Sequence, residues 1–197
     1  MRGKIFLIFG LILFTTSLSI AQKDSSYTDN RDGKIYKTVK IGTQTWMAEN
    51  LNYQTTDSWC YNDSTANCTK YGRLYTWKAA LKACPSGWHL PSDTEWAVLS
   101  NNSGGKFISG GNLKSVSSWA KPNTDATNSS GFSSLAGGFR SGDGKYGDVG
   151  YQGCWWSSAE IDTNYAWYRV MTNESSYLLK YNLFSKSFGV SVRCIKD

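Results

Sequence analysis

The 197 residues carry a formal net charge of +6 at pH 7, and the basic side chains are scattered singly along the chain. Nucleic-acid-binding domains gather lysine and arginine into stripes or patches, so this distribution indicates that nucleic acid is not a partner. The length suits one domain, and 19 glycines against three prolines favour many turns and short strands over a helical bundle.

The first 21 residues have the three parts of a secretory signal. Arg2 and Lys4 supply the positive start, residues 5–14 form an apolar run, and Ser19 and Ala21 are small residues before an expected cleavage after Ala21. The apolar run is shorter than the about 20 residues that span a bilayer, and no cysteine follows it as a lipid anchor. We therefore expect an extracytoplasmic protein, secreted, periplasmic or at the cell surface, with no membrane span after cleavage.

The mature chain is expected to begin with a flexible, polar lead-in over residues 22–32, and the folded domain should cover residues 33–197. Apolar residues alternate over 35–41, and Gly42 and Thr43 then turn the chain into a returning strand over 44–47. This pattern predicts a β-hairpin.

Two helices should follow. The first covers residues 72–83, where Leu74, Trp77 and Leu81 recur at helical spacing. The second starts at a capping box, in which the Ser92 hydroxyl accepts from the amide of Glu95 and the Glu95 carboxylate accepts from the amide of Ser92. Residues 101–105 should end this second helix.

Short strands and glycine loops are expected beyond residue 105. The best strand candidates are residues 155–159, 165–171, 176–181 and 188–195. Trp155 and Trp156 are neighbours in the first of these strands and must point to opposite sides, so at least one belongs to the core. Two early helices followed by an antiparallel meander of strands predict an α+β fold.

Export places the five cysteines in an oxidising compartment, where disulfides form. Cys60 and Cys68 flank a polar, turn-rich segment and are expected to pair. Cys84 ends the first predicted helix and Cys194 lies in the last strand, and this pair would close a loop of about 110 residues. Cys154 is left over, either as a buried thiol without reactivity or as a reactive or intermolecular one.

No constellation of residues points to catalysis. His89 is the only histidine and is assigned to the turn before the second helix. Glu160 is assigned to a salt bridge with Arg140 or Arg169. No Gly-x-Ser-x-Gly segment, close cysteine pair or phosphate loop is present, so we expect no cofactor and no metal.

The glycine-rich segment 141–150 and the aromatic residues after it are the candidate ligand-binding surface. Aromatic rings beside short polar groups suit sugar or peptide surfaces. The candidate residues are Asp143, Tyr146, Asp148, Tyr151 and Trp156. The two carboxylates could alternatively hold calcium, although Lys145 intrudes and the alternating acids of an EF-hand loop are absent.

Six segments in order resemble the Fibrobacter succinogenes major paralogous domain over about residues 33–197. They are QTWMAENLNY (44–53), KYGRLYTWKAA (70–80), ACPSGWHLPSDTEW (83–96), SSGFSSLAGGFR (129–140), WWSSAE (155–160) and SFGVSVRCIKD (187–197). The segment WHLPSDTEW and the C-terminal ending also resemble formylglycine-generating-enzyme-like domains. The resemblance implies a C-type-lectin-like fold, in which a disulfide such as Cys84–Cys194 joins a helix to the last strand.

The leading functional hypothesis is an exported, non-catalytic recognition or cell-surface domain that binds a glycan or an envelope component. One alternative is an enzyme on a formylglycine-generating-enzyme-like scaffold. That family holds copper between two nearby cysteines, whereas Cys154 stands alone here once Cys194 is paired. The other alternative is a purely structural component of the cell surface.

Overall fold

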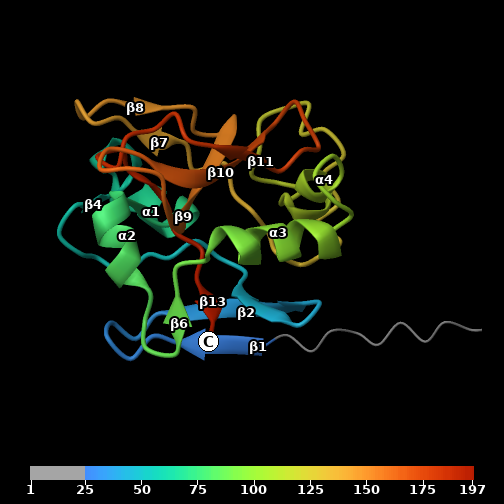
Figure 1. The fold of residues 1–197 in the computed structure, drawn as a ribbon, viewed down its shortest axis with the longest axis horizontal. Helices are drawn as coiled ribbons and strands as arrows, with labels where there is room; N and C mark the ends of the chain where they lie inside the picture. The colour runs from blue at the N-terminus through green and yellow to red at the C-terminus, as the bar shows by residue number, and fades with distance from the viewer. Residues whose placement is uncertain (1–24) are drawn as a thin grey trace, which may run out of the picture.

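The computed structural model describes residues 25–197, in which two β-sheets and short helices form an α+β fold. The first sheet has the strand order β1-β2-β3-β13-β6 and lies at the bottom of Figure 1, where the C-terminus also lies. Its strands are β1 (Ser25–Thr28), β2 (Ile35–Ile41), β3 (Gln44–Met47), β13 (Ile195–Lys196) and β6 (Trp88–His89). The predicted hairpin is confirmed by the pairing of β2 with β3.

The second sheet has the strand order β11-β10-β9-β12-β5-β4. Its strands are β11 (Leu179–Tyr181), β10 (Ala166–Thr172), β9 (Gln152–Glu160), β12 (Val190–Ser191), β5 (Leu74–Tyr75) and β4 (Ser58–Trp59). A separate hairpin joins β7 (Phe139–Arg140) to β8 (Tyr146–Gly147). The predicted antiparallel meander is wrong in one place, because β12 runs parallel to β9.

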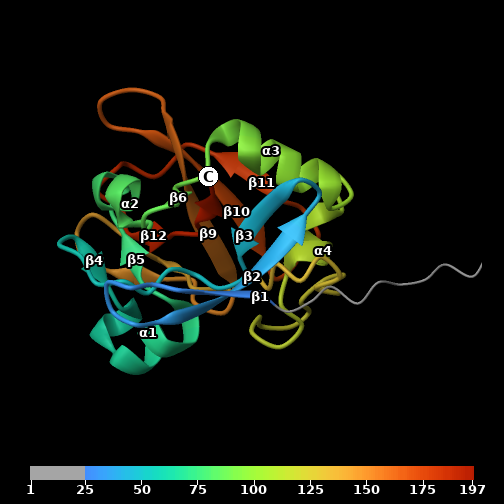
Figure 2. The ribbon, with the colours of Figure 1, turned by 90° about the horizontal axis from the view of Figure 1, so that it is seen from below.

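The helices flank the central strands. They are α1 (Thr65–Tyr71), α2 (Trp77–Ala83), α3 (Asp93–Asn102) and α4 (Ser109–Leu113), and a 3₁₀ turn, η1, covers Tyr61–Asp63. Figure 2 shows α1 and α2 on one side of β9 and β10, and α3 and α4 on the other. The predicted capping box of α3 is present.

Several sequence predictions differ from the structure: α1 and α4 were not predicted, and the strand predicted over 176–181 covers only Leu179–Tyr181. The first predicted helix begins at Trp77 rather than at residue 72, because the side chains of Leu74 and Tyr75 are buried in strand β5. The predicted strand over 188–195 is divided between the two sheets as β12 and β13. Residues 22–32 are not a flexible lead-in where the structure describes them, because residues 25–28 pair with β2 as strand β1.

Strand β9 separates two hydrophobic cores. Trp155 packs in one core and Trp156 in the other, and neither side chain is exposed. The prediction that the two rings point to opposite sides is confirmed. Each indole N–H has an acceptor, Asn50 Oδ1 at 2.8 Å for Trp155 and the Tyr75 carbonyl at 2.8 Å for Trp156.

A fully buried arginine near the C-terminus, Arg193, makes hydrogen bonds to two earlier segments of the chain. The Arg193 guanidinium donates to Asn50 Oδ1 at 3.0 and 3.2 Å, to the Met47 carbonyl at 3.0 Å and to the Phe132 carbonyl at 2.5 Å. Burial lowers the pKa of Arg193 to about 9 because the charged form is desolvated. These carbonyl and amide oxygens compensate for part of that desolvation.

Both predicted disulfides are present, with Cα–Cα separations of 4.8 Å for Cys60–Cys68 and 5.9 Å for Cys84–Cys194. Cys154 is a free, fully buried thiol. Burial raises the pKa of this thiol well above its usual range, which leaves it unreactive. The predicted signal peptide and its cleavage after Ala21 lie outside the described residues.

Candidate functional site

The predicted loop residues Asp143 and Tyr146 lie on the β7–β8 hairpin. The exposed Asp143 carboxylate accepts from the hydroxyl of Ser141 and from the Lys145 ammonium, at 2.9 Å for the latter. The Ser141 hydrogen bond, with those from Lys145, holds the pKa of Asp143 well below its usual range. The hairpin itself therefore provides the partners of this carboxylate.

Tyr146 fastens the hairpin to η1. Its hydroxyl donates to Asp63 Oδ1 at 2.7 Å, and its ring centroid lies 5.2 Å from that of Tyr61. The Arg140 guanidinium lies 4.1 Å from the ring centroid of Trp59 and 5.9 Å from that of Tyr146. Burial and the neighbouring Asp63 carboxylate raise the pKa of Tyr146. This half-buried tyrosine thus has a clear packing role.

The other three predicted site residues have separate surroundings. Asp148 has a positive φ of 60°, and its carbonyl accepts from the amide of Tyr151 at 3.0 Å, so it shapes a turn. The Tyr151 side chain is 59% exposed and is available to a ligand. Trp156 is fully buried, and its assignment to the binding surface is wrong because alternation along β9 turns its ring into the core.

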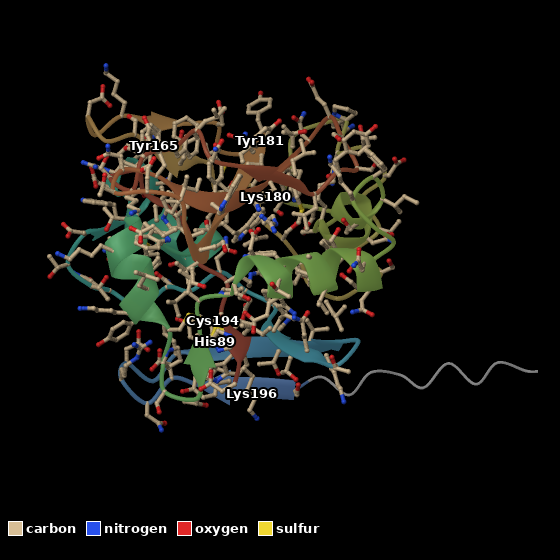
Figure 3. All side chains as sticks on the ribbon, viewed as in Figure 1. His89, Tyr165, Lys180, Tyr181, Cys194 and Lys196 are labelled. Atoms are coloured by element: carbon tan, nitrogen blue, oxygen red, sulfur yellow. A yellow bond between two sulfur atoms is a disulfide. The ribbon has the colours of Figure 1, made fainter. Side chains whose placement is uncertain are left out.

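The structure reveals a groove that no local sequence pattern indicated. It lies between α3 and the edge strand β11 and has a volume of about 500 Å³, within the size range of small-ligand sites. Helix α3 contributes Ser100 and Asn101 to its wall, and the opposite side includes Lys180 and Tyr181. Figure 3 shows Lys180 and Tyr181 at the end of the molecule remote from His89 and Lys196.

An ion network connects the strand side of the groove to the start of α3. Arg169 and Lys180 are paired residues of β10 and β11, and both reach Asp93 at the start of α3. The Arg169–Asp93 contact is 2.8 Å, and Arg169 also donates to the Asp93 carbonyl at 3.2 Å. Burial lowers the pKa of Arg169, an effect that the Asp93 carboxylate opposes. The Lys180 ammonium also lies 3.7 Å from the ring centroid of Trp167.

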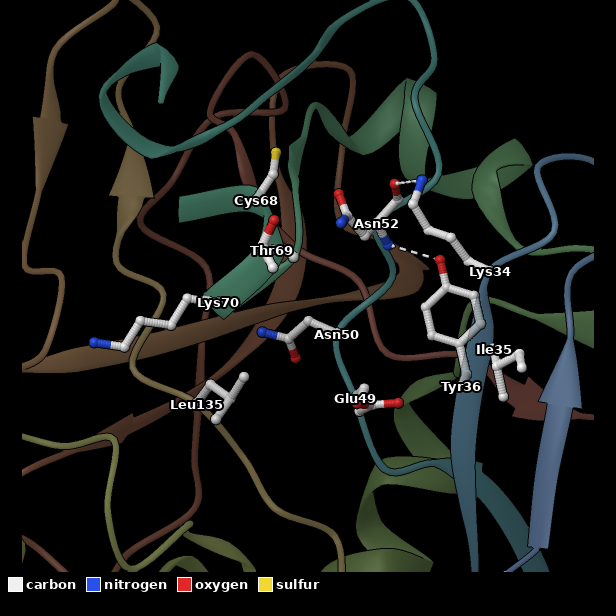
Figure 4. A pocket seen from close by; sticks show the side chains of 11 residues that line it. Lys34, Ile35, Tyr36, Glu49, Asn50, Asn52, Cys68, Thr69, Lys70 and Leu135 are labelled. Atoms are coloured by element: carbon white, nitrogen blue, oxygen red, sulfur yellow. Dashed lines mark hydrogen bonds between the residues drawn. The ribbon is translucent and has the colours of Figure 1, made fainter. Parts of the chain in front are cut away.

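A second, smaller cavity of about 190 Å³ lies beside β2 and the segment that follows β3 (Figure 4). The polar groups on one side of it are used within the protein. Lys34 Nζ donates to the Asn52 carbonyl at 2.9 Å, and the Asn52 amide donates to the Tyr36 hydroxyl at 3.1 Å. Its size and satisfied polar groups make it a weaker candidate than the groove.

The charged residues considered for chemistry have structural partners. His89 bridges Glu95 at 2.8 Å and Asp197 at 2.6 Å beside the capping box of α3, which agrees with the predicted structural role. Glu160 pairs with Lys186, and Arg169 pairs with Asp93, so the salt bridge predicted for Glu160 is wrong. Within residues 25–197, no group of three or more His, Cys, Asp or Glu residues is placed to hold a metal ion.

The family model of the Fibrobacter succinogenes major domain matches residues 39–196. The chain belongs to this family. No curated protein and no solved structure was found to match it. Across the described part of this Fibrobacter succinogenes major domain, no helix is long and apolar enough to cross a membrane.

The groove residues of this Fibrobacter succinogenes major domain escaped the sequence analysis for a physical reason. Asp93 is 76 residues from Arg169 along the chain. The register between β10 and β11 places Lys180 beside Arg169, and both side chains then reach Asp93 on α3. The alternation of Trp167 and Arg169 along β10 is a signal that places both side chains on one face. That signal indicates the groove only when the neighbouring strand and helix are known.

Proposed function

We propose that this protein is an extracytoplasmic, non-catalytic recognition domain with a C-type-lectin-like fold, and that it binds a glycan or an envelope component in the groove between α3 and β11. The single observation that carries the proposal is the composition of the groove. A partly exposed aromatic ring, Trp167, lies 3.7 Å from the Lys180 ammonium, and Lys180 lines the groove together with the short polar side chains of Ser100 and Asn101. Aromatic faces cover the apolar faces of sugars, and short polar groups bond their hydroxyls.

The arrangement of the chain supports a lectin-like fold. Strands β1 and β13, near the two ends of the described chain, lie in the same sheet, and the Cys84–Cys194 disulfide joins the end of α2 to the segment before β13. Residues 103–150 contain little regular structure and lie between α3 and the central strand β9.

Two disulfides and the secretory signal support the extracytoplasmic location. Cell fractionation with an antibody against the chain tests this part of the proposal. We expect the protein in the periplasmic, surface or medium fraction, at a mass without residues 1–21. A cytoplasmic protein of full mass would contradict it.

Binding of the mature chain, residues 22–197, to a glycan array and to isolated cell-envelope fractions tests the recognition function. Trp167→Ala should weaken the strongest interaction, because truncating a ring that stacks on a bound group typically costs about 1–3 kcal/mol. Tyr151→Ala is the matched control, since it removes an exposed aromatic ring from the predicted loop rather than from beside the groove.

The two variants separate the candidate surfaces. Loss of binding in Tyr151→Ala but not in Trp167→Ala would move the site to the loop before β9. A folded mature chain that binds no glycan and no envelope fraction would contradict recognition altogether. Thermal unfolding of each variant must show that it is folded before its binding is compared.

A further inference from the structure

The charges around the groove do not balance. Lys106, Arg169 and Lys180 line it, and none of the described lining residues is an aspartate or glutamate. The carboxylate of Asp93 lies within ion-pair distance of Arg169 and Lys180. One carboxylate against three cations leaves the groove positive by about two charges at neutral pH.

The three cationic side chains differ in their burial and in their contacts within the protein. Arg169 is nearly buried and binds Asp93 through both its carboxylate and its carbonyl. Lys180 shares the same carboxylate, but its side chain is 41% exposed. Lys106 lies 5.5 Å from the ring centroid of Phe107, which is itself largely exposed. Lys106 and Lys180 are therefore the two cations that can turn toward a bound anion.

We infer that the groove binds an acidic polysaccharide, with uronate carboxylates held by Lys106 and Lys180 and a sugar ring placed against Trp167, whose ring centroid lies 3.7 Å from the Lys180 ammonium. This inference rests on the proposed recognition function and names its class of ligand. Ser100 and Asn101 on the helix side present the short polar groups that sugar hydroxyls require.

The same observations disfavour an acidic peptide. A bound peptide strand would pair with the sheet edge, and strand β11 at that edge contains only three residues, Leu179–Tyr181. A polysaccharide needs no backbone ladder, because rings and charges along the groove are enough to bind it.

The experiment compares polygalacturonate with its fully methyl-esterified form, which has the same backbone without the charges. Alginate serves as a second acidic polysaccharide. Affinity electrophoresis or calorimetry of the mature chain in EDTA should show binding to both acidic polymers. Methyl esterification should weaken binding at least tenfold, and raising the salt concentration should weaken the acidic interaction, because the charges on this open groove are screened.

Charge-removing variants locate the site. Lys106→Gln and Lys180→Gln should each weaken binding of polygalacturonate about three- to fivefold, as expected for partly exposed ion pairs, and the double variant about tenfold or more. Lys82→Gln is the matched control, because it removes an exposed lysine from α2, away from the groove. It should leave the affinity unchanged.

Each contrary result has a distinct meaning. Equal affinity for the acidic and esterified polymers, or binding of neutral glycans only, would overturn the acidic ligand and leave the proposed recognition function standing. Acidic binding that is unchanged in the double lysine variant would overturn the groove as its site. A folded chain that binds neither acidic polymer, nothing on the glycan array and no envelope fraction would overturn the inference and the proposed function together.

Discussion

Replacing Asn50 with leucine should be among the most destabilising single substitutions in this protein. The side chain is 3% exposed, and its Oδ1 atom accepts from Trp155 and from two nitrogens of Arg193. Its Nδ2 atom donates to the Tyr71 carbonyl at 2.8 Å and to the Ser191 hydroxyl at 3.3 Å. Leucine fills a similar volume but provides none of these bonds, so the change isolates the polar contribution.

The magnitude follows from the groups left without partners. The Arg193 guanidinium loses a charge-assisted acceptor, which costs about 1.5–3 kcal/mol, and the buried Trp155 N–H loses its acceptor at about 1–3 kcal/mol. We therefore expect Asn50→Leu to lower the free energy of unfolding by about 4 kcal/mol. That is a large share of the about 5–15 kcal/mol that stabilises a typical domain.

Urea denaturation followed by tryptophan fluorescence measures the change, with Asn52→Leu as the matched control. Asn52 lies two residues along the chain and is half-buried, and its backbone carbonyl and amide bond to Lys34 and Tyr36. The control should change the free energy of unfolding by less than about 1 kcal/mol. A similar small loss in both variants would refute the view that Asn50 is the acceptor on which Arg193 depends.

A double-mutant cycle with Arg193→Met makes the test independent of the total loss. Once the guanidinium is absent, removing Asn50 should cost about 1–2 kcal/mol less than it does in the natural chain. Additive losses would show that the two side chains do not stabilise each other.

Three further predictions concern the Cys84–Cys194 disulfide, the free thiol of Cys154 and the protonation of His89. Replacing Cys84 and Cys194 together by alanine should lower the free energy of unfolding by about 4–5 kcal/mol, as measured by urea denaturation, because the bridge closes a sequence separation of 110 residues. Cys154 should resist iodoacetamide in the native protein and react in urea, and mass spectrometry that finds it alkylated without denaturant would contradict its burial. Burial lowers the pKa of His89, but its hydrogen bonds to two carboxylates outweigh this and raise it above 6.5. The protonated His89 therefore stabilises the protein fully below pH 6.5, and this stabilisation is lost as the pH rises through the pKa of the folded state. The loss should be absent when the free energy of unfolding of His89→Gln is measured against pH.

The sequence carries enough information for the features set by nearby residues. The Ser92–Glu95 capping box lies within one turn of helix, and the hairpin over residues 35–47 depends on alternation across a short turn. Both are confirmed. The opposite orientation of Trp155 and Trp156 follows from strand geometry alone, although geometry could not tell that both rings are buried.

Features that depend on distant residues were not predictable in this way. Leu74 has helical spacing to Trp77, but pairing with Trp59 and Ser191 places it in a sheet instead. Burial in that sheet outweighs the weak preference that spacing expresses. The groove is a similar case, since its charges meet only through the register between β10 and β11.

The wide spacing of the second disulfide affects the order in which the thiols can pair during the proposed export. A chain that crosses a membrane N-terminus first delivers Cys84 to the oxidising side 110 residues before Cys194 arrives. Cys60 and Cys68 are only eight residues apart and can form their disulfide as soon as both are exported. Cys84 stays unpaired until Cys194 arrives, and Cys154, which is exported in between, is a competing thiol. Packing of β9 between the two cores buries Cys154, so this competing thiol is out of reach of the last bridge once the cores have formed.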